Sequence, residues 1–142
     1  MSGILFVCTG NTCRSPMAEG IFNAMAEMQG KESRAFSRGL FPAEGECASP
    51  GAQYAAEELG FSLEGHRATL LTAEDLRRAD RVYGMSGQHL REIARRFPEA
   101  AKKLLPLPCG DVSDPYGGSP ERYLQTALQL REALSDILEE MP

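Results

Sequence analysis

The sequence predicts one α/β domain of three layers, in which helices cover both faces of a four-stranded parallel sheet. Two observations support this prediction. Short apolar runs alternate with segments in which apolar residues recur every three or four positions, which is the order of strands and crossover helices in a parallel sheet. The chain has 142 residues, of which 42% are hydrophobic and 25% charged. This size suits one core, and therefore a single domain over residues 1–142.

The first half of the chain supplies two of the strands and two of the helices. Ile4 to Val7 is a continuous apolar run, as expected of a strand buried on both faces. Apolar residues recur at helical spacing from Pro16 to about Gly30, and Arg34 to Gly39 is a weaker second strand. After a loop over residues 40–49, we expect a helix from Pro50 to Leu59.

The second half continues the alternation. Thr72 begins a capping-box pattern for a short helix, and Arg81 to Met85 is the third predicted strand. Ser86 is a candidate cap for a helix that reaches Phe97. The segment from Leu104 to Leu107 contains a proline and is therefore restricted to a short or edge strand. An apolar stripe predicts a last helix from Pro120 to Met141.

Three Ser-Pro pairs are predicted to mark three of the helix starts. A serine side chain caps free backbone N–H groups, and proline is favoured at the first helical position. The predicted caps with their prolines are Ser15-Pro16, Ser49-Pro50 and Ser119-Pro120.

Charge and composition argue against several kinds of partner. The net charge of −5 gives no reason to expect nucleic acid or an anionic membrane, because both need a clustered positive field. Arginines and lysines gather between residues 91 and 103, but their helical spacing is typical of a solvated face without a binding role. The first residues lack the pattern of a signal peptide, and no run reaches membrane-spanning length. We therefore expect a cytoplasmic protein, and we favour a monomer.

The cysteines do not form a recognisable disulfide or metal pattern. They lie unevenly at positions 8, 13, 47 and 109, and without an export signal we expect reduced thiols. The four cysteines and two histidines show none of the close paired spacings of zinc sites. No metal and no cofactor is therefore expected.

The most informative segment is the loop between the first strand and the first helix. Cys8 lies where the strand ends, and in an open parallel sheet ligands bind beyond the carboxyl ends of the strands. Backbone N–H groups in a tight turn and at a helix start form a nest for an anion, and Gly10 and Asn11 tolerate the backbone angles that such a turn needs. The predicted phosphate-binding loop contains Cys8, Thr9, Gly10, Asn11, Thr12, Cys13, Arg14 and Ser15.

Three side chains suit phosphoryl chemistry. A field that binds phosphate also lowers the pKa of a thiol, so we expect Cys8 to be an ionised nucleophile. The planar, permanently charged guanidinium of Arg14 can hold two phosphate oxygens at once. Asp114 lies in a turn-rich loop after the last strand, at the same edge of the sheet. One carboxyl group there could protonate the leaving atom and later activate water.

These residues resemble the low molecular weight protein tyrosine phosphatase family over nearly the whole chain. The segment from Val7 to Pro16 is similar to the family's nucleophile loop, and Asp114-Pro115-Tyr116 is similar to its general-acid motif. The resemblance implies a flavodoxin-like fold, a phosphorylated protein substrate and a phosphocysteine intermediate. By this resemblance Cys8, Arg14 and Asp114 are the catalytic residues.

The resemblance also implies supporting roles. Ser15 would donate a hydrogen bond to the thiolate, and Asn11 would brace the loop. His66 resembles the family's histidine that binds the loop asparagine from behind, although a surface or core histidine is the alternative. The family usually has Ser-Ala-Gly after its second strand, whereas this chain has Ser37-Arg38-Gly39.

Substrate preference is expected to depend on Thr12, Phe41 and Tyr116. The two aromatic residues are candidates for pocket walls. Tyrosine-directed relatives typically have a larger apolar residue at the position of Thr12, and the loop together with Gly117-Gly118 looks more like the protein-arginine phosphatase branch. We therefore favour phosphoarginine in proteins as substrate, with phosphotyrosine as the alternative, and a neutral role of Thr12 stays open.

Two other functions and one further role stay open. A thiol-dependent arsenate reductase would need relay thiols, yet residues 81–90 contain no cysteine, and only Cys47 and Cys109 could substitute. A phosphate-binding module without catalysis would not need the full set of catalytic residues. Cys13 either traps an oxidised Cys8 as a disulfide or is a small packing residue.

Overall fold

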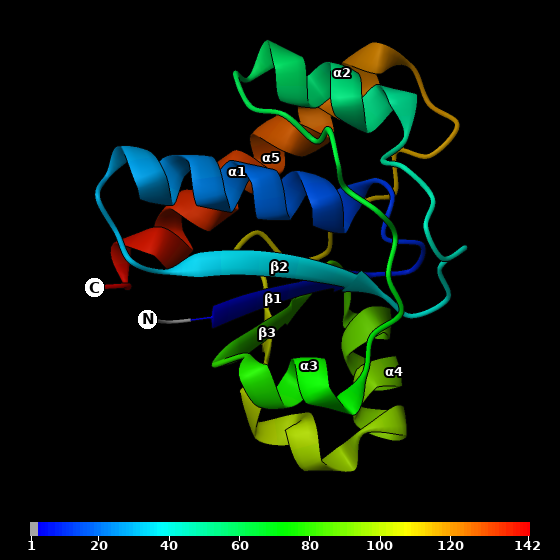
Figure 1. Cartoon of the computed structure of the whole chain (residues 1–142), viewed down its shortest axis with the longest axis vertical. Helices are drawn as coiled ribbons and strands as arrows, with labels where there is room; N and C mark the ends of the chain where they lie inside the picture. The colour runs from blue at the N-terminus through cyan, green and yellow to red at the C-terminus, as the bar shows by residue number, and fades with distance from the viewer. Residues whose placement is uncertain (1–2) are drawn as a thin grey trace.

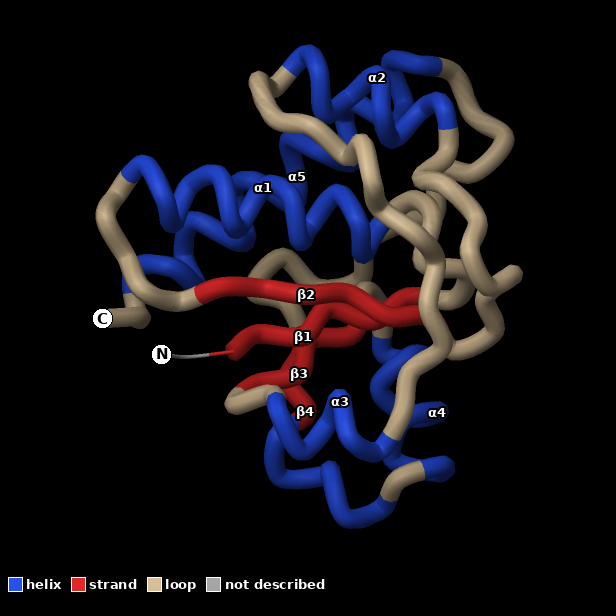
Figure 2. Tube along the Cα trace, viewed as in Figure 1, coloured by secondary structure: helices blue, strands red, loops and turns tan. Residues whose placement is uncertain are grey.

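The structure is a computed structural model that describes residues 3–142. Its four strands form one parallel sheet with the order β2-β1-β3-β4 (Figure 2). The elements in chain order are β1 (Gly3–Cys8), α1 (Arg14–Met28), β2 (Arg34–Gly39), α2 (Pro50–Glu58), α3 (Ala73–Arg78), β3 (Arg81–Gly84), α4 (Gly87–Arg96), the 3₁₀ helix η1 (Pro98–Lys103), β4 (Leu104–Pro106) and α5 (Pro120–Glu139). The predicted three-layer α/β fold is confirmed.

Helices cover both faces of the sheet. Figure 1 shows α1 and α5 on one face, with α2 packed outside them, and α3 and α4 on the other face. The central strand β1 supplies both cores, because successive side chains of a strand point to opposite faces. Ile4 and Phe6 belong to the core beneath α1 and α5, whereas Leu5 and Val7 belong to the core above α3 and α4. All four side chains are fully buried, as the continuous apolar run predicts.

The sheet places the ends of its strands beside one another. Cys8 pairs with Gly39 at the end of β2, and Val7 pairs with Gly84 at the end of β3. Since all strands are parallel, the segments that follow them start at the same edge of the sheet. The loop after β1 is therefore flanked by the loops after β2 and β3.

Two of the three predicted serine caps are present, and the third is wrong. Ser49 accepts a hydrogen bond from Ala52 N, and Ser119 accepts one from Arg122 N, both at 3.3 Å. Ser15 is instead the second residue of α1, which begins at Arg14 with no side-chain cap. Its hydroxyl is not available for capping because it binds other side chains of the loop, described below.

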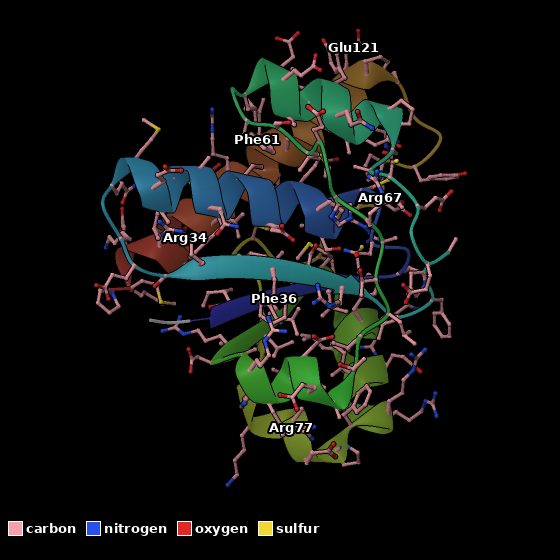
Figure 3. The ribbon with its side chains drawn as sticks, in the orientation of Figure 1. Arg34, Phe36, Phe61, Arg67, Arg77 and Glu121 are labelled. Atoms are coloured by element: carbon pink, nitrogen blue, oxygen red, sulfur yellow. The ribbon has the colours of Figure 1, made fainter. Side chains whose placement is uncertain are left out.

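Arg38, the departure from the family's usual Ser-Ala-Gly, is accommodated on the α3 side of the sheet. Its Nε donates to Asp75 Oδ2 at 3.0 Å, at the N-terminus of α3. Its guanidinium also lies 5.2 Å from the ring centre of Phe36, which Figure 3 shows between β2 and α3. The arginine thus links β2 to α3. Within the described residues, no helix is long and apolar enough to cross a membrane.

Candidate active site

A cavity of about 200 Å³ opens at the carboxyl edge of the sheet. The loop after β1 forms its floor, from Cys8 to the start of α1 at Arg14, and the loop between β4 and α5 closes it with Asp114 and Tyr116. Groups that are a hundred residues apart in sequence thus line one cavity. The lining residues are Cys8, Thr9, Gly10, Thr12, Cys13, Arg14, Asp114 and Tyr116.

The thiol of Cys8 is buried, with 3% of the residue's surface exposed. Its Sγ lies 2.8 Å from Ser15 Oγ and accepts a hydrogen bond from Asn11 N at 3.3 Å. Burial raises the pKa of Cys8, while the hydrogen bonds from Ser15 and Asn11 and the charge of Arg14 lower it by less. The expected lowering of this pKa is therefore wrong, because desolvation at the end of a buried strand disfavours the thiolate more than these groups favour it.

Asn11 holds the loop in shape from a fully buried position. Its φ of 56° lies in the left-handed region, whereas Gly10 does not adopt a positive φ. The sequence allowed such an angle at either residue of this turn, and the structure has it at Asn11. The Asn11 side chain donates from Nδ2 to Ser15 Oγ at 2.9 Å and to Ser37 Oγ at 3.0 Å. Its Oδ1 accepts from Thr69 N at 3.0 Å. The amide group is thus bonded on both its nitrogen and its oxygen, which stabilises the left-handed turn.

Two further contacts support the loop from behind. His66 Nε2 and the backbone oxygen of Asn11 are 2.7 Å apart and form a hydrogen bond. At Gly39 a Cβ atom would lie 2.9 Å from Thr9 O and 3.0 Å from Asn11 Cβ. Only glycine therefore lets β2 approach the loop this closely.

Arg14 is a buried cation held in place by two groups. Only 8% of the residue is exposed. Its Nη1 donates to Val112 O at 3.1 Å, and its Nη2 lies 3.6 Å from Asp114 Oδ2. Asp114 is half exposed, and its Oδ1 accepts from Tyr116 N at 3.1 Å. The predicted phosphate ligand and the predicted acid are therefore direct neighbours.

The structure separates the two predicted aromatic walls. Tyr116 lines the cavity together with Thr12. Phe41 does not line it: the ring is 66% exposed, borders a neighbouring cavity and lies 4.3 Å below the guanidinium of Arg96. The assignment of Phe41 to this pocket wall is therefore wrong, because the chain after β2 turns toward α4.

Cys13 shares the cavity with Cys8 but packs toward the helices. Its Sγ lies 3.3 Å from Ser49 Oγ and 3.6 Å from Tyr123 Oη. The residue is 5% exposed. Neither contact was predicted from the sequence: Ser49 was expected only as the cap of α2, and Tyr123 comes from α5 and meets the loop only in the folded chain.

His89 is another residue whose role the sequence did not predict. Its Nε2 lies 2.9 Å from Thr9 Oγ1 and its Nδ1 lies 2.9 Å from Ser86 Oγ, so it links the loop to the start of α4. Burial, assisted by the charge of Arg14, lowers the pKa of His89 to about 4. The neutral ring donates to one hydroxyl and accepts from the other. Its position in the first turn after β3, at the same sheet edge as Cys8, was the available signal.

A thiol, a guanidinium and a carboxylate around one anion-sized cavity are the groups that a phosphatase with a cysteine nucleophile needs. The family model described as "Low molecular weight phosphotyrosine protein phosphatase" matches residues 3–142. The chain belongs to this family, and the resemblance predicted from the sequence is confirmed.

Relatives in the family differ in the substrate that their names state. A protein-arginine-phosphatase of Bacillus subtilis is 40% identical over 97% of this chain and 95% of the relative. A solved low molecular weight protein tyrosine phosphatase from T. tengcongensis is 43% identical, with a TM-score of 0.95 over 99% of this chain and all of that one. A YwlE arginine phosphatase mutant with a phosphorylated active-site serine is 39% identical, with a TM-score of 0.94 over 97% of this chain and 94% of that one.

Proposed function

We propose that the protein removes phosphate from phosphoarginine in proteins through a covalent intermediate on Cys8. The observation that carries the proposal is the position of Thr12 in the wall of the cavity that also contains Cys8, Arg14 and Asp114. A polar, small side chain at this position leaves room for a guanidinium and offers it a hydroxyl. The name of the Bacillus subtilis relative and the phosphorylated active-site residue of the arginine phosphatase neighbour support the proposal.

In the first step Cys8 loses its thiol proton to solvent and attacks the phosphorus atom as the thiolate, which the hydrogen bond from Ser15 and the charge of Arg14 favour. The loop amides and Arg14 hold the phosphoryl oxygens, and the bond between phosphorus and the guanidine nitrogen breaks as the S–P bond forms. Neutral guanidine is a strong base, and its anion is too unstable to leave. Asp114 therefore gives its proton to the departing nitrogen.

In the second step water hydrolyses the phosphocysteine. The carboxylate of Asp114 takes a proton from water, the water oxygen attacks phosphorus, and the S–P bond breaks. Both electrons of that bond return to sulfur, which leaves as a thiolate. Ser15 Oγ, at 2.8 Å from Sγ, is placed to donate a hydrogen bond to it.

Matched peptides that carry phosphoarginine or phosphotyrosine test the substrate. We expect kcat/KM to favour phosphoarginine at least about tenfold, and Thr12→Ile to narrow that ratio, because the longer apolar side chain fills space and removes the hydroxyl. Cys8→Ser should abolish turnover of both peptides. A wild-type preference for phosphotyrosine would contradict the proposal, and an unchanged ratio in Thr12→Ile would remove Thr12 from the argument.

Phosphotyrosine is the second candidate, favoured by the exposed ring of Tyr116 in the cavity wall and by the tyrosine phosphatase neighbour. Arsenate reduction has less support. Cys47 and Cys109 are exposed, and neither lines the cavity with Cys8. Reduction of arsenate coupled to thioredoxin would be the result that favours it.

A further inference from the structure

A second cavity, of about 420 Å³, lies directly beside the catalytic one. Thr9 lines both cavities, so the two adjoin at this residue. Residues after β2 form one side, and one face of α4 along most of its length forms the other. The lining residues are Thr9, Leu40, Phe41, Gln88, His89, Arg91, Glu92 and Arg95.

Arginine side chains dominate the charge around this cavity. Glu92 is the one acid in its lining, and it binds Arg95 at 2.6 Å and Arg96 at 2.6 Å. Hydrogen bonds from Arg95 and Arg96 lower the pKa of Glu92 to about 2, so it stays ionised and occupied by its partners. Among the described residues Arg91 has no ion pair, and His89 is neutral, as described above. One guanidinium is therefore free to take a carboxylate.

Asp111 is an acid that approaches Arg91, but among the described residues the two side chains form no ion pair. Asp111 Oδ1 accepts a hydrogen bond from Gly87 N at 2.9 Å. It lies 3.9 Å from the position that a Cβ atom on Gly87 would take, and Arg91 Nη1 lies 3.2 Å from the same position. Phe41, with Arg96 stacked on its ring, forms an apolar wall opposite α4. The cavity thus combines an exposed aromatic wall with a positively charged side.

We propose that this second cavity is a substrate subsite that binds an acidic side chain a few positions from the phosphorylated residue. The inference rests on the proposed function, since it needs a protein substrate. Neighbouring residues in an extended chain are about 3.3 Å apart along its axis, so an aspartate or glutamate two or three positions away is about 7–10 Å from the phosphorylated residue. The chain as a whole carries a charge of −5, so its overall field does not attract an acidic substrate. A preference of the enzyme for acidic substrates must therefore come from the arginines around this cavity.

Peptides with matched flanks test the subsite. The two peptides of a pair differ only at the flanking positions, where one has Asp and the other Asn. One series of pairs carries phosphoarginine and a second series carries phosphotyrosine. We expect the wild type to favour the acidic member about threefold to fivefold in kcat/KM, through KM, since exposed ion pairs are weak. The preference should shrink at high salt. Arg91→Gln should abolish it, while turnover of a small aryl phosphate without flanks stays unchanged.

Arg131→Gln is the matched control, because Arg131 is an exposed arginine of α5 that borders neither cavity. It should keep the flank preference. Equal hydrolysis of the Asp and Asn peptides by the wild type, or a preference that survives Arg91→Gln, would overturn the subsite and leave the phosphatase function standing. Failure to hydrolyse any of the peptides would overturn the proposed function and the subsite with it.

Discussion

The neighbours of Ser15 orient its hydroxyl group. Asn11 Nδ2 donates to Ser15 Oγ at 2.9 Å, which leaves the serine's own hydrogen for Cys8 Sγ at 2.8 Å. Asn11 is held in turn by Ser37, whose hydroxyl donates to Glu19 Oε1 at 2.7 Å. This chain of hydrogen bonds fixes a donor beside the sulfur before any substrate binds.

Ser15→Ala tests that donor. Removing a hydrogen bond that favours the thiolate should raise the pKa of Cys8 further, and it should lower kcat about tenfold, because a hydrogen bond to a charged group contributes about 1.5 kcal/mol or more. The pH dependence of thiol alkylation measures the first effect and rapid-quench kinetics the second. An alkylation profile identical to that of the wild type would contradict the assignment.

Cys13 gives a second prediction for a single residue. It lines the same cavity as Cys8, so mild peroxide should produce a disulfide between Cys8 and Cys13 that dithiothreitol reverses. Mass spectrometry of the digested protein detects the bond. In Cys13→Ser, the same treatment should instead drive Cys8 to irreversible oxidation. Equal recovery of activity in the two proteins would show that Cys13 is only a packing residue.

At the level of elements, the start of α4 is coupled to the phosphate loop. Thr9 belongs to the loop and Ser86 caps the helix, and His89 is hydrogen-bonded to both hydroxyls. The residue is buried, with 6% of its surface exposed. The geometry makes His89 a positioning residue, because it acts on the loop through Thr9.

His89→Gln is expected to change the pH dependence of stability. The pKa of His89 is lowered from about 6.5 to about 4 on folding, so the unfolded chain binds the proton more tightly. The wild type should therefore lose stability as the pH falls from about 6.5 toward 4, by up to about 2 kcal/mol at pH 5. The variant should lack this loss.

Urea unfolding at pH 7 and pH 5 measures this difference. A variant that keeps the full wild-type loss between the two pH values would contradict the prediction. Kinetics give a second measurement: if His89 positions the loop, kcat on an aryl phosphate should fall more than KM rises.

For the molecule as a whole, the last helix, α5, belongs to the same core as the first strand, β1. It packs on α1 and α2, and its buried residues share one core with the first residues of β1. Leu134 is fully buried, whereas Leu128 of the same helix is 39% exposed. Because both residues are leucines of one helix, replacing each in turn shows how much burial contributes to stability.

Leu134→Ala should cost about 2–5 kcal/mol of unfolding free energy, because it leaves a cavity between α5 and the helices it packs on. Leu128→Ala should cost less than about 1 kcal/mol. Urea unfolding monitored by circular dichroism gives both values. Similar losses in the two variants would show that α5 is not part of the cooperative core.

The order of the elements and the loop that carries the chemistry can be predicted from local sequence patterns. Periodicity is local, so the apolar run before Cys8 and the apolar stripe of the last helix predict β1 and α5 directly. Ser15 was misassigned as a cap because a Ser-Pro pair has the same pattern whether the helix begins before or after it.

Which distant side chains meet the loop, and which of them are charged there, depends on how the helices pack in the folded chain. His89 and Tyr123 reach it from α4 and α5, and Phe41 turns away to a second cavity. The pKa of Cys8 depends on burial, which no local pattern reports, and it rises where the loop sequence alone predicted a fall. The spacing of the arginines of α4 predicted a solvated face without a binding role. Because α4 packs beside the loop, two of them, Arg91 and Arg95, instead line a cavity next to that of Cys8.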